Sequence, residues 1–502
     1  MDSPAMDLLT QVETLNKIGI ALTSETNLEK LMGLIVQKAR ELTNADGGSL
    51  YLKEKDVLYF YVTQNDTLSD RGNLKGGFKH RYELPLTEES IAGFVAVTGK
   101  ILNIEDAYNL PETVSYRFNF DFDHENNYRT RSILVAPMKA PDGEVVGVLQ
   151  LINTMDNTGN VVVFPKAVES LVNSLASQAA VAIRNARLIN DIKNLFKSLI
   201  QYSASAIDAR SPHTAGHSRR VAAYSGAVAM AINAAETGYF ADVTFTAEQL
   251  EELHYAAWLH DIGKIGVPEH VLDKRSKLSD DNLSAIKARF ELIKTLETCK
   301  LHERLREKKN LDKEDLKKSV HAVRTDLQDK YDLICRISTS NFLSDNDLNM
   351  LQNIASRRYT TLEGETRPYL EQEELYALSV TRGNLTREEY RQIQLHADHT
   401  LHIIENIPFP EYLENVPFFA ASHHEMLDGT GYPNGISGEA LPLQSRILAV
   451  VDIYDALTAS DRPYRRTMPV NKALNILKEE AEKDRLDKEI VKLFIEKELY
   501  NV

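Results

Sequence analysis

The sequence predicts a multidomain fold with three parts: an amino-terminal α/β (α+β) domain with a central antiparallel sheet, a long connecting helix, and a carboxy-terminal all-α domain that carries a helical insertion. Residues 1–165 mix an amphipathic helix with short β-rich runs, residues 166–210 keep an unbroken helical period, and residues 200–502 are almost wholly helical in pattern. With 502 residues, 43% of them hydrophobic, the chain can build a core for each part.

The amino-terminal domain contains a predicted helix and a predicted hairpin. Two β-rich runs, Ser132–Met138 and Glu144–Asn153, flank the turn-forming sequence Pro141-Asp142-Gly143, which favours an antiparallel hairpin. The helix is predicted by apolar residues at helical spacing: Leu28, Leu31, Leu34, Ile35 and Ala39.

The connecting helix has its apolar residues on one seam in alternating steps of three and four, which is heptad spacing. The seam comprises Val168, Leu171, Leu175, Ala182, Ile189, Ile192, Phe196 and Leu199, with polar Gln178 and Asn185 on the same line. This pattern fits two arrangements equally well: a helix that packs on its own domain, or a helix that forms a parallel homodimer.

A charged helical stretch from about residue 276 to residue 383 carries no catalytic motif and is predicted to be an insertion. The helix starts on either side of it resemble each other, as if one helix start had been split or duplicated. Such an insertion could serve as a lid or as a partner surface.

Composition excludes several classes of protein. The two cysteines, Cys299 and Cys335, lie outside any disulfide framework or zinc-ribbon spacing, which fits a reducing cytosol. A formal charge of −15 argues against binding duplex nucleic acid. The amino end shows no secretory leader, and no stretch has the roughly 18 apolar residues that a membrane span needs. We therefore expect a cytoplasmic protein that neither enters membranes nor binds duplex nucleic acid.

Paired metal-donor residues follow two apolar helices. His260-Asp261 follows the run from Tyr255 to Leu259, and His423-His424 follows the run from Val416 to Ala421. Such pairs of nitrogen and oxygen donors at the inner ends of buried helices suit metal coordination better than a lone histidine does.

Asp452 interrupts an apolar run, where an unpaired charge would be costly to bury. A bound metal would remove that cost. The alternative interpretation is a carboxylate paired with Arg446 or Arg462.

Three segments resemble the HD-GYP phosphodiesterases, a branch of the HD metal-dependent phosphohydrolases: HTAGHSRRV (His213–Val221), WLHDIGKIGVP (Trp258–Pro268) and the long block from His423 to Arg466. The resemblance implies seven metal ligands: His217, His260, Asp261, His396, His423, His424 and Asp452. Only the resemblance selects His396 over His399 and His402 on the same helix.

The resemblance also implies the cofactor, which is two or three divalent metal ions, most favourably iron or manganese. His213 stands where some members of the family carry a glutamate that holds a third metal. It is therefore a candidate third-metal ligand.

For catalysis, the resemblance implies that Asp261 bridges two metals and that Lys264 contacts the substrate phosphate. Two adjacent cations can stabilise both the attacking and the leaving oxygen of a phosphodiester. The candidate substrate-binding residues are Lys264, Asp428, Gly429, Gly431, Tyr432, Pro433, Arg462 and Arg465. The glycines permit close backbone approach, and the arginines can form forked bonds to phosphate.

The family's substrate class implies hydrolysis of cyclic di-GMP to linear pGpG, with a further step to GMP left open. Two alternatives stay open: a phosphohydrolase of another cyclic dinucleotide such as 3′3′-cyclic GMP-AMP, and a receptor that binds a cyclic dinucleotide without cleaving it.

The amino-terminal part resembles a GAF domain through GGSLYL (Gly47–Leu52), YRTRSILVAPM (Tyr128–Met138) and GEVVGVLQLIN (Gly143–Asn153). Some GAF domains bind cyclic nucleotides through an Asn-Lys, Phe, Asp-Glu set, of which this chain keeps only Asn153, Phe164 and Glu169. The expected ligand of this domain is therefore an unnamed small molecule, and a purely structural, dimerising domain is the alternative. We expect the connecting helix to transmit the state of this domain to His213 and His217.

Overall fold

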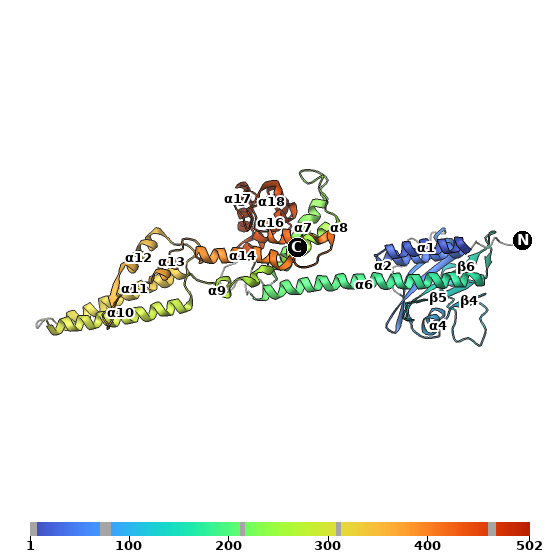
Figure 1. Cartoon of the computed structure of the whole chain (residues 1–502), viewed down its shortest axis with the longest axis horizontal. Coiled ribbons are helices and arrows are strands. Elements are labelled where there is room, and N and C mark those ends of the chain that lie inside the picture. The colour runs from blue at the N-terminus through green and yellow to red at the C-terminus, as the bar shows by residue number, and fades with distance from the viewer. Residues whose placement is uncertain (1–7, 71–81, 211–215, 308–312, 460–467, 502) are drawn as a thin grey trace. The chain divides into compact units, whose positions relative to one another are not determined.

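The computed structural model describes residues 8–70, 82–210, 216–307, 313–459 and 468–501. The chain divides into two compact units, residues 1–197 and residues 198–502 (Figure 1). His213, Arg462 and Arg465 lie outside the described residues.

An antiparallel sheet forms the centre of the first unit, with strand order β3-β2-β1-β6-β5-β4 and β7 paired to β6. The strands are β1 (Ala45–Glu54), β2 (Val57–Asn65), β3 (Tyr82–Pro85), β4 (Leu102–Ile104), β5 (Ile133–Lys139), β6 (Val145–Met155) and β7 (Val161–Val162). The hairpin predicted on either side of Pro141 is confirmed, because β5 pairs antiparallel with β6.

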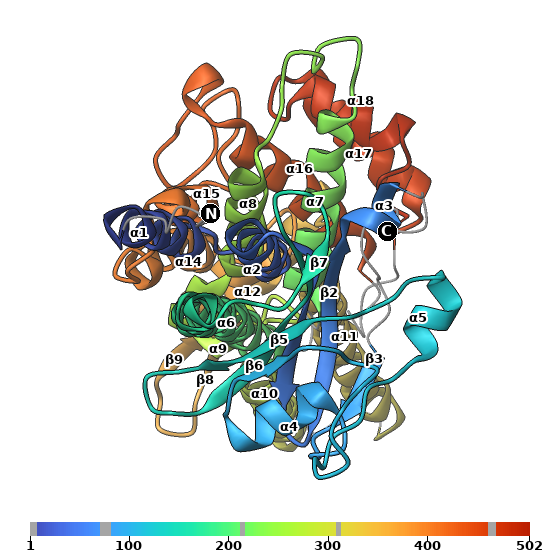
Figure 2. The ribbon, with the colours of Figure 1, turned by 90° about the vertical axis from the view of Figure 1, so that its right-hand side faces the viewer.

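Helices cover both faces of this sheet (Figure 2). They are α1 (Leu8–Ser24), α2 (Leu28–Thr43), α3 (Asp66–Asp70), α4 (Ile91–Thr98) and α5 (Asp121–Asn126), together with the first part of α6 (Lys166–Arg210). Successive side chains of a strand point to opposite faces. Leu50 of β1 therefore packs with α1, α2 and α6, whereas neighbouring Tyr51 packs on the face that α4 covers.

The amphipathic helix predicted near Leu28 is α2, and its ends show why it stops where it does. The Asn27 side chain accepts hydrogen bonds from the amides of Glu29 and Lys30, which caps the first turn. At the other end Asn44 takes a left-handed conformation with φ 50°, which ends the helix.

The connecting helix α6 runs from Lys166 to Arg210, as predicted. Its first half packs in the core of the first unit through residues that include Leu175, Ala179 and Ile183. Packing on its own domain, one of the two arrangements left open by the sequence, is therefore correct as far as Ala186. Beyond that point, several of its apolar side chains are exposed.

The second unit is helical, with only one short pair of strands among its described residues. Its helices outside the insertion are α7 (His217–Asn233), α8 (Ala247–Leu259), η1 (Ile262–Gly266), α9 (Glu269–Leu272), α14 (Arg387–Ile404), η2 (Glu411–Leu413), α15 (Val416–Ala421), η3 (Gly438–Ala440), α16 (Leu443–Thr458), α17 (Val470–Glu482) and α18 (Lys488–Glu496), where η denotes a 3-10 helix. In the resulting bundle α7 packs on α8 and α16, and α14 packs on η1 and α15.

The predicted insertion has a hydrophobic core of its own, centred on residues such as Phe290, Ile334 and Leu351. It contains α10 (Asp280–Glu307), α11 (Lys313–Thr339), α12 (Asp345–Ser356), β8 (Arg358–Thr360), β9 (Thr366–Pro368) and α13 (Gln372–Leu378). Helices α10 and α11 lie side by side (Figure 1), and β8 pairs with β9, a small departure from the all-α expectation.

Polar contacts hold the two ends of the insertion together. Lys274 Nζ contacts Glu389 at 2.7 Å, and the buried Lys277 ammonium donates to the carbonyl oxygen of Val380 at 2.6 Å. Because the two ends of the insertion meet in this way, the insertion can extend from the helical bundle without interrupting the packing of the bundle's own helices.

No helix among the described residues is long and apolar enough to cross a membrane.

Candidate metal centre

The seven candidate metal ligands converge in one buried cluster, although 235 positions separate His217 from Asp452 in the chain. His217 is the first residue of α7, His260-Asp261 follow α8, His396 lies within α14, His423-His424 follow α15, and Asp452 lies within α16. All of them except His424 are buried, and His424 is half-buried. Three overlapping groups of these side chains could hold metal ions.

One half of the cluster joins His217 and His260 to the two carboxylates. His217 Nε2 lies 3.3 Å from Asp261 Oδ2 and 3.2 Å from Asp452 Oδ1. His260 Nε2 lies 3.4 Å and 3.8 Å from the same two oxygens.

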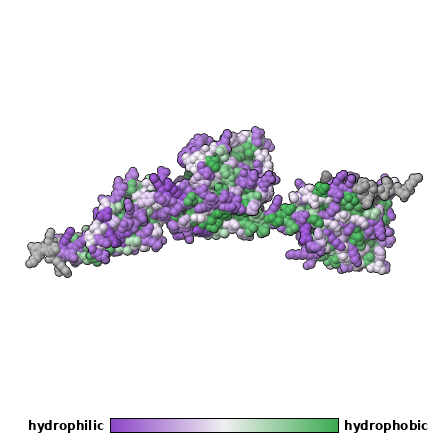
Figure 3. Space-filling model, viewed as in Figure 1, coloured by the Kyte–Doolittle hydropathy of each residue, from purple (hydrophilic) through white to green (hydrophobic). Residues whose placement is uncertain are grey.

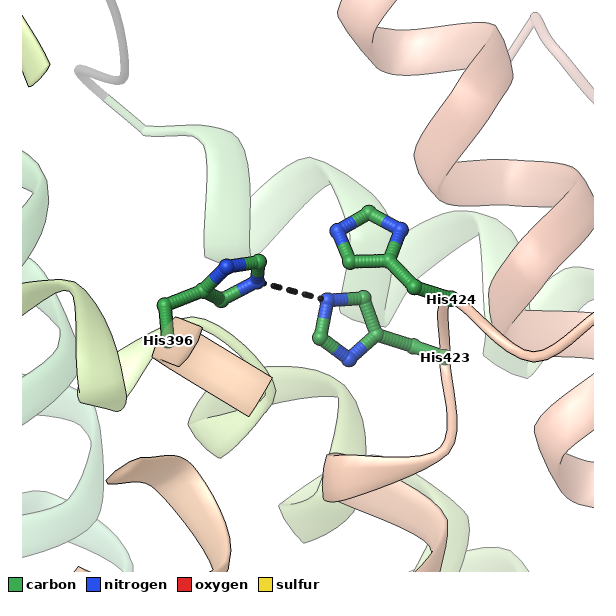
Figure 4. A group of neighbouring side chains, drawn as sticks. All are labelled: His396, His423 and His424. Carbon is green, nitrogen blue, oxygen red and sulfur yellow. Dashed lines mark hydrogen bonds between the residues drawn. The ribbon is translucent and has the colours of Figure 1, made fainter. Parts of the chain in front are cut away.

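The other half contains His396, His423 and His424, whose rings point toward one another from two elements (Figure 4). Here the carboxylates present their remaining oxygens: Asp261 Oδ1 lies 3.5 Å from His396 Nε2, and Asp452 Oδ2 lies 3.8 Å from His424 Nδ1. Each carboxylate therefore has one oxygen in each half, which is the arrangement that a bridging ligand of two metals needs.

Hydrogen bonds fix the tautomers of four of these histidines. A backbone carbonyl oxygen can only accept, so a ring nitrogen that contacts one must carry the proton. The Nδ1 contacts are His260 with Ala257 O at 2.7 Å, His396 with Ile393 O at 2.6 Å, His423 with Ala420 O at 2.6 Å, and His217 with Asp455 Oδ2 at 2.7 Å. Each Nε2 atom therefore faces the cluster as the candidate metal-binding nitrogen.

Two of these Nε2 atoms face each other closely. His396 Nε2 lies 3.3 Å from His423 Nε2. Burial lowers the pKa of His423 well below its ordinary value and lowers the pKa of His424 to about 3, so both rings are uncharged at neutral pH, each with a single N–H. Two facing lone pairs repel unless a cation lies between them, and a divalent metal fits this donor set of imidazole and carboxylate.

The carboxylates keep their charge. Burial alone would raise the pKa of Asp261, but Lys264 and His260 outweigh it and hold the pKa well below its ordinary value. For Asp452, His217 outweighs burial and again lowers the pKa. At His217 the order is reversed: burial would lower the pKa, but Asp261 and Asp452 raise it well above its ordinary value. The centre is thus negative enough to attract cations.

The interpretation of Asp452 as the partner of Arg446 is wrong. Arg446 instead contacts Asp487 at 3.3 Å and donates to the carbonyl oxygens of Leu441 and Gly438, at 2.6 Å and 3.0 Å. Six positions separate Arg446 from Asp452 on α16, so the two side chains leave the helix in different directions and only Asp452 reaches the cluster.

Lys264 lies beside the cluster, where its ammonium pairs with Asp261. Burial would lower the pKa of Lys264, but Asp261 raises it above its ordinary value, so the side chain stays charged. Two other histidines of α14, His399 and His402, stay out of the cluster although they share this helix with His396. His399 packs against Gly266, and the exposed His402 pairs with Glu405 at 3.0 Å.

Asp455 is a member of the site that the sequence analysis missed. Its Oδ2 accepts from His217 Nδ1, and its Oδ1 accepts from Arg220 Nε at 2.6 Å. The carboxylate therefore orients the His217 ring, and Arg220 holds the carboxylate in place. The available signal was its position three residues after Asp452 on one helix, which puts both on neighbouring faces.

Thr400 is a second residue that was missed. Its hydroxyl donates to the carbonyl oxygen of His260 at 2.8 Å and accepts from the amide of Gly263 at 3.0 Å, which fastens the His260-Asp261 turn to α14. Gly263 is required there because an added Cβ would overlap the carbonyl oxygen of His396 and the amide of Thr400. No sequence pattern indicates a contact across this distance in the chain.

The segment from Asp428 to Pro433 contains a turn whose backbone passes close to the histidine pair. An added Cβ at Gly431 would overlap backbone atoms of Glu425 and Met426, and Gly429 has a φ of 76° that favours glycine. Glu425, which was also missed, is buried and accepts from the amides of Asn434 at 2.7 Å and Ile436 at 3.0 Å.

Within this segment the side chains of Tyr432 and Asp428 differ in what they contact. The Tyr432 ring lies 4.7 Å from the His424 ring, and burial raises the pKa of its hydroxyl, which stays protonated. The Asp428 carboxylate instead accepts from Thr430 at 2.6 Å and faces Arg485 at 3.4 Å, so it shapes the turn. Pro433 is half-buried next to Tyr432.

In the first unit, the partial cyclic-nucleotide set is occupied by internal contacts. The Asn153 amide donates to Tyr128 Oη at 2.9 Å and to the carbonyl oxygen of Arg129 at 2.8 Å. Glu169 accepts from Asn103 at 2.9 Å, and the hydroxyl of Thr154 donates to the carbonyl oxygen of Thr43 at 2.7 Å. These three side chains hold the domain together.

Family comparisons agree with both units. A family described as GAF domain matches residues 27–183, and two families described as HD domain match residues 214–334 and 373–490. The first HD match contains His260 and Asp261, and the second contains the His423 pair and Asp452. The chain therefore consists of a GAF domain followed by an HD-domain region.

Several relatives with curated names each match a part of the chain. The chain is 45% identical over 98 residues to 3′3′-cGAMP-specific phosphodiesterase 3 of Vibrio cholerae, which is 19% of this chain and 20% of that protein. It is 38% identical over 113 residues to 3′3′-cGAMP-specific phosphodiesterase 1 of the same organism, which is 22% and 25%. It is 36% identical over 95 residues to the cyclic di-GMP phosphodiesterase response regulator RpfG of Xanthomonas campestris, which is 19% and 25%. The matches thus span about a fifth to a quarter of each relative.

We expect Gly263→Ala to disrupt the centre, because the new methyl group must displace α14 or the His260 turn. Overpacking of this kind costs roughly 1–3 kcal/mol, and we expect it to lower bound metal measured by mass spectrometry. The matched control is Gly226→Ala on α7, where an added Cβ meets nothing within 4 Å. A normal metal content in Gly263→Ala would contradict the close packing described above.

We expect Asp455→Asn to weaken metal binding about tenfold, because loss of a carboxylate that orients a metal-binding histidine typically has an effect of this size. Competitive titration with a metal chelator measures it. Asp280→Asn, a change at an exposed residue of α10, should leave the affinity unaltered. Equal affinities for the wild type and Asp455→Asn would show that His217 needs no such support.

Proposed function

We propose that this protein is a metal-dependent cyclic-dinucleotide phosphodiesterase that hydrolyses cyclic di-GMP to linear pGpG, with GMP as a further product. The single observation that carries the proposal is the pair of half-sites that share Asp261 and Asp452, each carboxylate with one oxygen in each half. The domain bounds that go with it are residues 1–165 for the GAF domain, 166–210 for the connecting helix and 200–502 for the catalytic domain, with an insertion at about 276–383.

In this proposal His217, His260, His396, His423 and His424 hold two divalent metals, with Asp261 and Asp452 shared between them. Iron or manganese suits imidazole and carboxylate ligands without thiolate. His213 is the candidate ligand for a third metal. When bound, such ions supply Lewis-acid stabilisation of phosphoryl oxygens and a nucleophile at neutral pH.

The protein's own groups bind and orient the substrate. Lys264, kept charged by Asp261, is placed to bind a phosphate oxygen next to the metals. Tyr432, with its protonated hydroxyl against His424, lines the mouth of the site together with Asp428, Gly429, Gly431 and Pro433. Arg462 and Arg465 are proposed to bind the remaining phosphate or a base.

A second candidate substrate is 3′3′-cyclic GMP-AMP. It is supported by the 45% identity to a phosphodiesterase named for that dinucleotide. The third candidate, a receptor without hydrolysis, has less support, because a binding function alone would not need so complete a set of metal donors.

The GAF domain is proposed to regulate turnover through α6 in response to a small molecule, and the protein is proposed to act in the cytoplasm.

The second half of α6 supports a further proposal, which is a parallel homodimer. Leu188, Ile192, Leu195 and Leu199 follow one another in steps of four, three and four, and each is more than half exposed. This part of α6 presents a hydrophobic surface (Figure 3), and heptad spacing is what a second copy of the same helix can cover.

We expect Asp261→Ala to abolish hydrolysis, with a loss of roughly a thousandfold or more, because it removes a ligand shared by both half-sites. The experiment is anaerobic purification with metal analysis, followed by chromatography of the products from cyclic di-GMP and from 3′3′-cyclic GMP-AMP. His402→Ala, which removes an exposed histidine of α14, is the control and should keep full activity. Metal-loaded wild type that binds either dinucleotide without cleaving it would support the receptor instead.

We expect Leu195→Glu to dissociate the proposed dimer. Leu195 is one of the four exposed apolar residues named above, and a charge at this position would be buried against the same residue of the second copy. Asn194→Glu, one position away on the same helix and exposed, should not dissociate it. Sedimentation equilibrium of the full chain measures both. A monomeric wild type would rule out the dimer, and equal behaviour of the two variants would move the interface away from this seam.

A further inference from the structure

The last turns of α6 are part of the second unit and pack on it through one face. Ile200, Ala204 and Asp208 are buried and follow one another in steps of four, so they lie along one stripe of the helix. Gln201 and Ile207 are half-buried, and the other residues of these turns, such as Tyr202 and Ala209, are exposed. The end of the connecting helix is thus held against the catalytic bundle by a narrow line of contacts.

Arg210, the final residue of α6, binds the turn that carries Lys264. Its Nη1 donates to the carbonyl oxygen of Ile265 at 2.7 Å and contacts that of Lys264 at 3.4 Å, and its Nη2 donates to that of Val267 at 3.3 Å. One guanidinium therefore holds three carbonyl oxygens, two within the 3-10 helix η1 and one at Val267 directly after it. A lysine has no comparable fork and could not hold all three.

Two residues earlier on α6, Asp208 binds the start of the helix that carries His217. Its carboxylate accepts from the amide of Ser218 at 3.1 Å and from the Ser218 hydroxyl at 3.2 Å. The carboxylate caps the first turn of α7, where amides lack partners within the helix. The end of α6 thus contacts the protein on two sides of the centre: at the turn after Asp261 and at the residue after His217.

We propose that Arg210 is a positioning residue that sets the place of Lys264 beside Asp261 through its bonds to η1, and that α6 acts on the catalytic centre at this point. The inference rests on the proposed function, since Lys264 matters to turnover only if a phosphate binds there. Arg210 is well suited to the role because its carbonyl partners belong to the same short turn as Lys264. A shift of the end of α6 therefore reaches that turn directly, through these bonds.

The first test is hydrogen exchange of the full chain, which requires no turnover. Arg210→Ala should speed exchange of the amides of residues 262–267 by roughly tenfold, since local opening follows the loss of local hydrogen bonds. Lys197→Ala removes an exposed cation of the same helix, and it should leave exchange there unaltered. Unchanged exchange of this segment in Arg210→Ala would overturn the proposal.

The second test is a double-mutant cycle on the metal-loaded full chain. Arg210→Ala should lower kcat roughly tenfold with the KM and metal content within about twofold of the wild type, because misplacing one charged group affects the reaction more than the fold. In a Lys264→Ala background the same change should have no further effect on kcat, since the two residues act as a unit. Additive losses would overturn the proposal, because Arg210 would then act by another route.

The two tests separate this inference from the proposed function. If the wild type cleaves neither cyclic dinucleotide but exchange of residues 262–267 still rises in Arg210→Ala, the phosphodiesterase proposal fails and the link between α6 and η1 stands. If the wild type cleaves and Arg210→Ala matches Lys197→Ala in both exchange and kcat, the phosphodiesterase stands and the positioning role fails.

Discussion

The structure of the second unit depends on one electrostatic constraint: deprotonated histidine nitrogens face each other in a buried site next to two carboxylates. His396 and His423 approach to 3.3 Å through nitrogens whose lone pairs repel, and burial lowers the pKa of His423 so that its ring stays uncharged. Such an arrangement is stable only when a cation joins the donors. The carboxylates of Asp261 and Asp452 fit that requirement, since each offers one oxygen to each half of the cluster.

The helical bundle supplies hydrogen-bond partners for the other polar atoms of this cluster. Carbonyl oxygens three residues earlier in the chain accept the Nδ1 protons of His260, His396 and His423, so ring orientation is set by the same segments that supply the rings. Thr400 and Asp455 then join elements that are far apart in the chain. Because each of these bonds aims a candidate ligand, small displacements of one helix would be felt at the centre.

The insertion and the connecting helix both join the helical bundle at its edges. The insertion has its own core and meets the bundle where Lys274 pairs with Glu389, so it can be present without altering the helices that carry the histidines. The connecting helix is different in kind. Its first half is a structural part of the GAF domain, and its last residues bind the backbone next to Lys264 and the start of α7. One helix therefore belongs to both the GAF domain and the second unit.

The sequence by itself determined the order of the domains, the limits of α6, the β5–β6 hairpin and the paired donors His260-Asp261 and His423-His424, because each of these is a local pattern of hydrophobic period or adjacency. It could not separate His396 from His399 without a family resemblance, since both lie on one helix and only packing against Gly266 turns His399 away. Tertiary structure alone revealed Asp455, Thr400 and Arg210, whose partners lie 238, 140 and 55 positions away in the chain. Their roles arise from the approach of separate helices, which no short window of sequence records.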